Sequence, residues 1–229
     1  MPVFTKGGVL PWLYRKILHK YYANDLWIDL RLAAKKEAVE YVRQNMQNAR
    51  VVNDRFELLR FGMQTAPREG LVLEFGVMKG RSIRCIAECT SRMVDGFDSF
   101  EGLPCDWRGG REAKGTFSTK GKLPKVPDHV RLHAGWFDAT LPPFLAAHKE
   151  DVAFLHVDCD IYESTQTVFQ QLGPRLKPGA VIVFDEYFNY PGWRQHEFKA
   201  FQEFIEASGR SYEYIGFSGE QGHVAVRLK

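Results

Sequence analysis

The sequence predicts an α/β fold in which helices cover both faces of a doubly wound, mostly parallel sheet of seven strands, preceded by N-terminal helices. From Gly70 onward, short β-branched runs alternate with helical patterns, which is typical of parallel strands buried on both faces. Near the end of the chain, two further runs are joined by SGEQG, a turn short enough for an antiparallel hairpin. Before Gly70, the apolar residues recur only at helical spacing.

Each expected strand is a short run of apolar and β-branched residues. The seven runs are residues 71–76, 93–98, 129–135, 152–158, 180–186, 212–217 and 223–229. Each expected helix places apolar residues on one face, and the third group follows a cap at Asn53 or Asp54. These groups are Leu10, Leu13, Ile17 and Tyr21; Ala38, Val42 and Met46; Val52, Phe56, Leu59 and Met63; Ile83, Ile86, Ala87 and Thr90; Thr165, Val168, Phe169, Leu172 and Leu176; and Phe198, Phe201, Phe204 and Ile205.

The change of pattern divides the chain into two parts. Residues 1–66 are expected to form a helical segment that caps a substrate pocket or packs between subunits, which would make the protein a homo-oligomer. Residues 67–229 are expected to form the sheet domain. The basic side chains of Arg15, Lys16 and Lys20 on the first helix would also suit a membrane surface, but docking on protein is the more common use of such a helix.

Composition argues against several classes of protein. With 31 basic and 28 acidic residues and no clustered basic patch, the chain shows no sign of a nucleic-acid partner. Residues 1–20 are interrupted by glycine, lysine and proline, so we expect neither a signal peptide nor a membrane span. The four cysteines form no CxxC pair and no disulfide framework, which favours a reducing, cytoplasmic location.

The connection from Phe100 to Asp128 shows no periodicity and is rich in Gly, Lys, Pro and Arg. A compact domain rarely keeps a loop of this length unless the loop covers or binds a ligand. We therefore expect a lid in which Trp107 and Phe117 close over a ligand. A flexible insertion is the alternative.

The turn after the first strand, LEFGVMKGRS, has the composition of a cofactor cradle. Gly76 and Gly80 allow a tight turn, and the helix that follows offers free amide donors. Asp98, at the end of the second strand, lies where an acidic side chain commonly binds ribose hydroxyls. Glu74 would repel a pyrophosphate and attract an ammonium, so the turn favours a nucleoside that carries an amino acid over a dinucleotide. Glu74 could instead cap the next helix.

Acidic residues end two neighbouring strands of the predicted sheet. Asp158 ends the fourth strand, and Asp185 and Glu186 end the fifth. Ligand crevices of open parallel sheets lie at these carboxyl ends. Three clustered acids repel one another, and a hard cation such as Mg²⁺ would relieve the repulsion. Mg²⁺ would also position a substrate hydroxyl and lower its pKa.

Several nearby residues have ordinary structural interpretations. Asp160 is expected to cap the helix that follows it, with a supporting role at the metal as the alternative. Cys159 and His156 are expected to pack in the core. His133 or His196 could assist as a base, although histidines more often pack or cap. The expected walls of the substrate pocket are Tyr162, Tyr187 and Trp193.

Five segments in order, LEFGVMKGRS, GFDSFEGLP, HAGWFDATLP, HVDCDIYEST and VFDEY, resemble the class I S-adenosylmethionine-dependent methyltransferases, and most of all the macrocin-type O-methyltransferases of sugars and antibiotics. The resemblance covers about residues 71–229 and implies a Rossmann-like fold whose last strand is antiparallel. It does not clearly include the N-terminal helices.

The resemblance also implies roles for individual residues. Asp158 would be the general base and, with Asp185 and Glu186, would hold the metal; the family usually has two aspartates at the latter pair, so Glu186 departs from the pattern by one methylene. The implied cofactor residues are Glu74, Gly76 and Ser82 at the methionine portion, Asp98 and Ser99 at the ribose, and Gly135, Trp136 and Phe137 at the adenine, with Phe75 and Asp158 completing the set.

We therefore expect an S-adenosylmethionine-dependent, Mg²⁺-assisted O-methyltransferase that acts on a hydroxylated small molecule such as a sugar or natural product. A metal-independent methyltransferase and transfer to nitrogen remain open. An NAD(P)-dependent oxidoreductase would share the sheet and Asp98, but the sequence lacks a third glycine at the turn and a Tyr-x-x-x-Lys pair after the fourth strand. A non-catalytic nucleoside-binding module is the alternative from another class.

Overall fold

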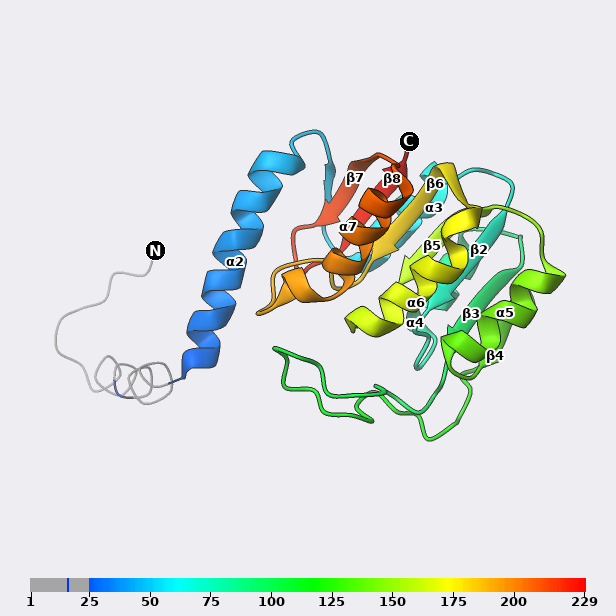
Figure 1. Ribbon diagram of the computed structural model, residues 1–229, viewed down its shortest axis with the longest axis horizontal. Helices are drawn as coiled ribbons and strands as arrows, with labels where there is room; N and C mark the ends of the chain where they lie inside the picture. The colour runs from blue at the N-terminus through cyan, green and yellow to red at the C-terminus, as the bar shows by residue number, and fades with distance from the viewer. Residues whose placement is uncertain (1–15, 17–24) are drawn as a thin grey trace.

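The computed structural model describes Lys16 and residues 25–229. The helix expected around Leu10 to Tyr21 lies outside this part of the chain, apart from Lys16. The described residues form a sheet with the strand order β1-β7-β8-β6-β5-β2-β3-β4 and helices on both faces (Figure 1). The strands are β1 (Arg50–Val52), β2 (Leu71–Phe75), β3 (Val94–Asp98), β4 (Val130–Ala134), β5 (Val152–Val157), β6 (Leu176–Phe184), β7 (Tyr212–Ser218) and β8 (Val224–Leu228).

The predicted α/β architecture and the antiparallel hairpin at the end of the chain are confirmed. β8 runs antiparallel to both β6 and β7, whereas the other neighbouring strands are parallel. The strand count is eight in the described residues, not seven. Val52, which was expected on a helix, pairs with Ser218 as part of the edge strand β1. A strand of three residues is too short to show alternation in the sequence.

The helices cover both faces of the sheet, as a doubly wound fold requires. They are α2 (Leu26–Asn45), α3 (Arg55–Thr65), α4 (Arg81–Glu88), α5 (Phe137–Ala147), α6 (Tyr162–Leu172) and α7 (Glu197–Ser208), with short 3₁₀ turns η1 (Gly173–Arg175) and η2 (Trp193–Gln195). Helices α3 and α4 pack with Val72 on one face, whereas α5, α6 and α7 pack with Leu73 on the other. Adjacent residues of β2 are therefore buried in different cores, which explains why the strand is buried along its whole length.

Two local features differ from the pattern of the sequence. Leu176, expected on the helix with Val168, begins β6, because Pro174 has no N–H with which to extend α6. Residues 137–147 were not assigned in the sequence but form α5, which contains Pro142 and Pro143. These prolines obscure the helical pattern.

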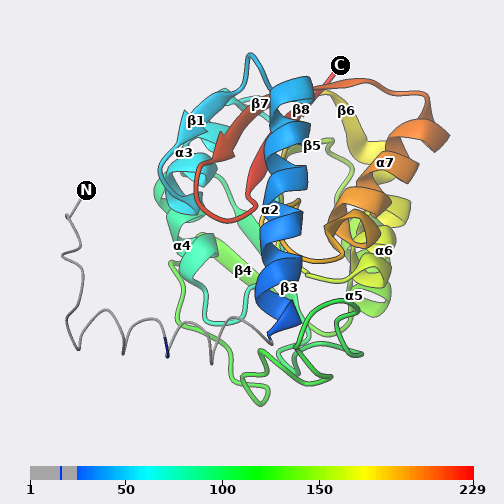
Figure 2. The same ribbon diagram turned by 90° about the vertical axis from the view of Figure 1, so that its left-hand side faces the viewer.

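The segment between β3 and β4 contains no helix or strand, yet it is held by its own backbone. The Leu103 amide donates to the Thr116 carbonyl oxygen at 2.9 Å, and the Gly121 amide donates to that of Phe100 at 3.1 Å. Figures 1 and 2 both show this green segment at the end of the sheet where α2 begins. Arg111 lies 3.6 Å from Asp25 just before α2, so the loop and α2 meet there. Among the residues described, every helix is too short or too polar to cross a membrane.

Candidate active site

A cavity of about 580 Å³ lies at the carboxyl ends of β2, β3, β5 and β6. Its wall includes the turn after β2, the start of the 99–129 segment, the N-terminal residues of α5 and the acids that follow β5 and β6. Four parallel strands therefore contribute to one crevice, at the position where open α/β sheets bind ligands.

The turn after β2 depends on glycine. Gly76 has φ +93°, and a Cβ there would overlap the carbonyl oxygen of Asp158. The Asp98 carboxylate fixes the same turn: it accepts hydrogen bonds from the amides of Val77 at 2.8 Å, Met78 at 2.7 Å and Phe100 at 2.7 Å. Asp98 thus holds both the turn and the start of the long segment next to the cavity.

The predicted cofactor residues fall into two groups. Those that line the cavity are Gly76, Ser82, Asp98, Ser99, Trp136, Phe137 and Asp158. Those that do not are Glu74, Phe75 and Gly135. Phe75 stacks on Phe97 with ring centroids 4.9 Å apart, and the Gly135 amide donates to the Asp98 carbonyl oxygen. Glu74 is fully buried, and one of its carboxylate oxygens accepts a hydrogen bond from His156 Nδ1 at 2.8 Å.

The acids at the strand ends form two overlapping sets, each of which has ligand atoms within 4.8 Å of one another. One set is Asp158, Asp160 and Glu186, and the other is His156, Asp158 and Asp185. Asp158 belongs to both sets, whereas Asp185 and Glu186, predicted as ligands of one ion, belong to different sets.

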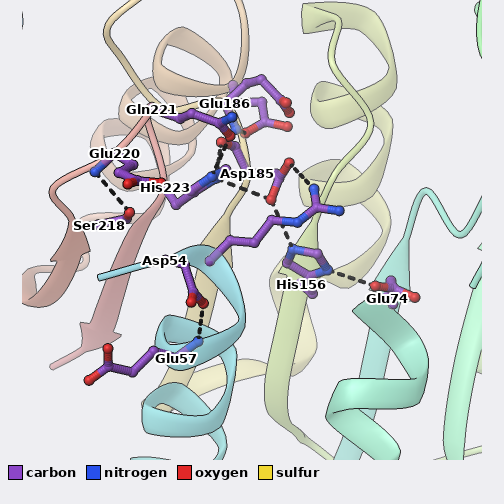
Figure 3. Close-up of polar contacts among 12 residues, drawn as sticks. Asp54, Glu57, Glu74, His156, Asp185, Glu186, Ser218, Glu220, Gln221 and His223 are labelled. Atoms are coloured by element: carbon purple, nitrogen blue, oxygen red, sulfur yellow. Dashed lines mark hydrogen bonds and ion pairs between the residues drawn. The ribbon is translucent and has the colours of Figure 1, made fainter. Parts of the chain in front are cut away.

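Asp185 is surrounded by basic groups (Figure 3). Arg55 on α3 lies 3.0 Å from its Oδ2, His223 Nδ1 lies 3.1 Å from its Oδ1, and His156 Nε2 lies 3.9 Å from the same oxygen. Burial acts to raise the pKa of Asp185, but the hydrogen bond and charge of His223, with the charges of His156 and Arg55, hold it below its ordinary value. Asp185 therefore remains ionised.

The pKa values of the other acids of the cluster shift in the opposite direction. Burial raises the pKa of Asp158 and of Glu186 well above their ordinary values, and the charge of Asp185 raises both further. Burial, with the charge of Asp185, raises the pKa of Asp160 to about 8. All three line the cavity, so a cation entering it would stabilise their ionised forms.

Asp160 does not cap the helix that follows it, contrary to expectation. Helix α6 begins after Ile161, and no side chain caps it. Asp160 instead adopts a left-handed backbone conformation, φ +66°, and joins the acid set. The sequence contained one signal for this role of Asp160. Asp158 and Asp160 are separated by a single residue, so both carboxylates can face the same side where the backbone turns.

Other residues expected near a ligand lie elsewhere. Tyr187 and Trp193 are fully buried in the core, and the Tyr162 hydroxyl donates to Glu203 at 2.6 Å, so none of these residues lines the cavity. His133 bonds to Asp95, and His196 Nε2 donates to the Arg108 carbonyl oxygen. Of the two aromatic residues expected to close over a ligand, Phe117 lines the cavity, whereas Trp107 packs on Tyr190 and His196.

Two residues of the site were not expected from the sequence. Arg55 comes from α3, far from the acids along the chain, and nothing in its local sequence marks it as part of the site. Glu197 is fully buried at the start of α7. It accepts a hydrogen bond from the Glu186 amide at 3.1 Å and so holds the backbone of the acid cluster in place.

The part of the sequence that carries the glycine turn and the acids matches a known family. A family model described as "Methyltransferase domain" matches residues 73–187, half of the chain. The chain belongs to this methyltransferase family. The matched range runs from β2 to just beyond Glu186, so it includes the turn and the acids of both sets.

Curated relatives of this methyltransferase act on natural products. The 8-demethyl-8-(2,3-dimethoxy-alpha-L-rhamnosyl)-tetracenomycin-C 4'-O-methyltransferase of Streptomyces olivaceus is 30% identical in an alignment that covers 58% of this chain and 60% of the relative. The mycinamicin III 3''-O-methyltransferase of Micromonospora griseorubida is 29% identical over 63% of this chain and 67% of the relative. The match thus spans less than two thirds of the Streptomyces olivaceus relative.

Solved structures support the same fold. The calicheamicin methyltransferase CalS11 superposes with a TM-score of 0.60 at 20% identity and covers 98% of this chain and 95% of its own. The O-methyltransferase NovP superposes with a TM-score of 0.57 at 25% identity, covering 76% of this chain and 78% of its own. The expected family resemblance is confirmed.

Proposed function

We propose that this methyltransferase transfers a methyl group from S-adenosylmethionine to a hydroxyl of a sugar or another hydroxylated natural product. The observation that carries the proposal is the cavity in which the Gly76 turn faces a cluster of acids across the strand ends. The relatives named as sugar O-methyltransferases support the choice of oxygen as acceptor and of a small molecule as substrate.

The proposed cofactor site runs along the lining from the glycine turn to α5. Gly76 and Ser82 would contact the methionine portion, Asp98 and Ser99 the ribose, and Trp136 and Phe137 the adenine side. Glu74, Phe75 and Gly135 do not line the cavity and would support the residues that do. The acid-rich lining also favours a sulfonium cation over a pyrophosphate.

Asp158 is proposed as the general base. It lines the cavity, and burial raises the pKa of its carboxyl, which makes the carboxylate a stronger proton acceptor. In the transfer, the bond between sulfur and the methyl carbon breaks as the carbon–oxygen bond forms. The hydroxyl proton passes to the Asp158 carboxylate, and S-adenosylhomocysteine leaves without charge at sulfur.

A divalent cation is part of the proposal, because the residues present fit one. The three acids lining the cavity with raised pKa values supply oxygen donors and gain from a nearby positive charge. Mg²⁺ on the predicted ligands Asp158, Asp185 and Glu186 would hold the substrate oxygen and lower its pKa.

All four cysteines are free, which supports the proposed reducing, cytoplasmic setting.

Binding of S-adenosylhomocysteine tests the cofactor choice directly. Because a ligand that binds only the folded state stabilises it, a concentration of 100 times Kd should raise the free energy of unfolding by about 2.7 kcal/mol. NADH serves as the matched control ligand and should leave the melting temperature unchanged. Stabilisation by NADH and not by S-adenosylhomocysteine would select the oxidoreductase instead.

A further inference from the structure

His156 on β5 is the buried group that the proposed function leaves unexplained. Its side chain is 1% exposed, and its Nδ1 donates a hydrogen bond to the Glu74 carboxylate at 2.8 Å. Its Nε2 is buried and has no hydrogen-bond partner among the described residues. A buried polar atom without a partner is costly in a folded protein, so Nε2 needs a ligand.

The environment of Nε2 indicates what kind of ligand this is. One nitrogen of His156 and one carboxylate oxygen each from Asp158 and Asp185 lie within 4.8 Å of one another, and Nε2 is 3.9 Å from Asp185 Oδ1. Around a six-coordinate ion with bonds of about 2.1 Å, adjacent ligand atoms lie about 3.0 Å apart and opposite ones about 4.2 Å apart. The 3.9 Å separation of Nε2 and Asp185 Oδ1 lies within this range, and no pair of the three ligand atoms exceeds the range by more than about 0.6 Å, so a small side-chain shift would let them bind one ion.

Neighbouring residues orient this set as they do in known metal centres. A histidine ligand usually donates its other ring N–H to a carboxylate, which fixes the ring and makes the ligating nitrogen more basic. Glu74 provides that carboxylate for His156. On the other side, Arg55 binds Asp185 Oδ2 and leaves Oδ1 facing His156, as Figure 3 shows for Asp185, His156 and Glu74.

We propose that His156 Nε2, with Asp158 and Asp185, binds a first-row transition-metal dication, and that Glu74 supports His156 in this role. An imidazole nitrogen among carboxylates favours Mn²⁺, Fe²⁺ or Co²⁺ over Mg²⁺, which prefers oxygen alone. The inference deepens the proposed function, on whose divalent cation it rests, and changes both its ligand set and its metal.

The test uses Mn²⁺ added to the purified full-length protein without cofactor. Pulsed electron paramagnetic resonance of the bound Mn²⁺ should show coupling to an imidazole nitrogen. The coupling should disappear in His156→Phe, together with a loss of Mn²⁺ affinity of about 10- to 100-fold, and Glu74→Gln should weaken Mn²⁺ binding by a similar factor while keeping the coupling. Mg²⁺ affinity should change by less than about 3-fold in His156→Phe, because Mg²⁺ gains little from nitrogen.

His223→Asn is the matched control, because His223 also contacts Asp185 but is not in the set. The nitrogen coupling should persist in this variant. Bound Mn²⁺ without nitrogen coupling, coupling that survives His156→Phe, or no Mn²⁺ binding would each overturn the inference. If His156→Phe does not fold, the wild-type and His223→Asn spectra still show whether an imidazole other than that of His223 binds the Mn²⁺. Binding of S-adenosylhomocysteine by the same samples shows separately whether the methyltransferase proposal stands.

Discussion

Gly76 is the residue on which the shape of the cavity depends most. Substitution of Gly76 by Ala would place a Cβ against the Asp158 carbonyl oxygen at φ +93°. We expect a loss of about 3 kcal/mol or more in the free energy of unfolding and no binding of S-adenosylhomocysteine.

Gly115→Ala separates overlap from backbone strain. Gly115 has φ +81°, but a Cβ there would meet nothing within 4 Å. Its cost should be about 1 kcal/mol, with cofactor binding retained. Equal costs for the two variants in urea unfolding would contradict the packing assigned to the turn.

Asp160 should lower the stability of the metal-free protein and strengthen cation binding. Its pKa is about 8 in the folded protein against an ordinary 3.8, so the folded state binds the extra proton between these values. Stability is therefore lost as the pH rises from about 4 to 8, and Asp160→Asn should remove this loss. Without metal, the variant should gain a few kcal/mol, on the order of 2 to 5, at pH 8 and almost nothing at pH 4.

Asparagine suits this position because it tolerates φ +66°. Thermal melts of the metal-free wild type and variant across this pH range provide the measurement. A gain that is the same at both pH values would show that Asp160 does not titrate in the folded protein as described. Weaker divalent-cation binding should accompany the gain.

At the scale of single residues, the sequence located the site better than it described the contacts within it. Asp158, Asp185 and Gly76 could be predicted because strand ends and turns follow from short-range pattern. Arg55 could not, because its contact with Asp185 joins α3 to the end of β6 across the fold. His156 was expected to be a satisfied core residue, and only the structure shows that one of its two ring nitrogens has no partner.

The 99–129 segment is an ordered element, and Trp107 is its anchor. Trp107 packs on Tyr190 at 5.7 Å and on His196, which binds the Arg108 carbonyl oxygen. Trp107→Ala should therefore lower the free energy of local opening of the segment by about 1 to 2 kcal/mol. Hydrogen exchange at the Leu103 and Gly121 amides should become faster as a result.

Leu123→Ala is the matched control in the same segment, because the Leu123 side chain is 53% exposed. This variant should change the free energy of local opening, measured by hydrogen exchange at the same amides, by less than about 0.5 kcal/mol. If both variants leave exchange unchanged, Trp107 does not hold the segment.

Helix α2 presents apolar side chains that no other part of the described chain covers. Leu32 and Val39 lie seven residues apart on one side of the helix and are 52% and 53% exposed. We propose that a second copy of the chain covers this stripe, in line with the expectation of a homo-oligomer. Leu32→Lys with Val39→Lys should halve the mass seen by light scattering. A wild-type protein that is monomeric at all concentrations would contradict this proposal.

At the scale of elements, long periodic helices and buried strands could be predicted, and irregular elements could not. The cap of α3 and the apolar faces of α3 and α7 follow from spacing, and Asp54 does cap α3. β1 is too short to show alternation, and α5 contains two prolines that its tertiary packing tolerates. Tertiary contacts override local preference in both cases.

In the whole molecule, the parallel topology brings together residues that are far apart in the chain. β2, β3, β5 and β6 are neighbours or near neighbours in the sheet, so the turn after β2 and the acids after β5 and β6 meet in one cavity. The hairpin of β7 and β8 adds His223 beside Asp185 from the end of the chain. The site is thus a product of a parallel sheet covered on both faces, which the alternating pattern of the sequence predicts; the order of the strands comes from the structure.

A crystal structure with S-adenosylhomocysteine and Mn²⁺ tests the central claim most directly. The nucleoside should lie between Asp98 and Trp136, with the sulfur facing Asp158 and the ion next to Asp158 and Asp185. A cofactor bound elsewhere, or a cavity that excludes it while the protein is folded, would contradict the account.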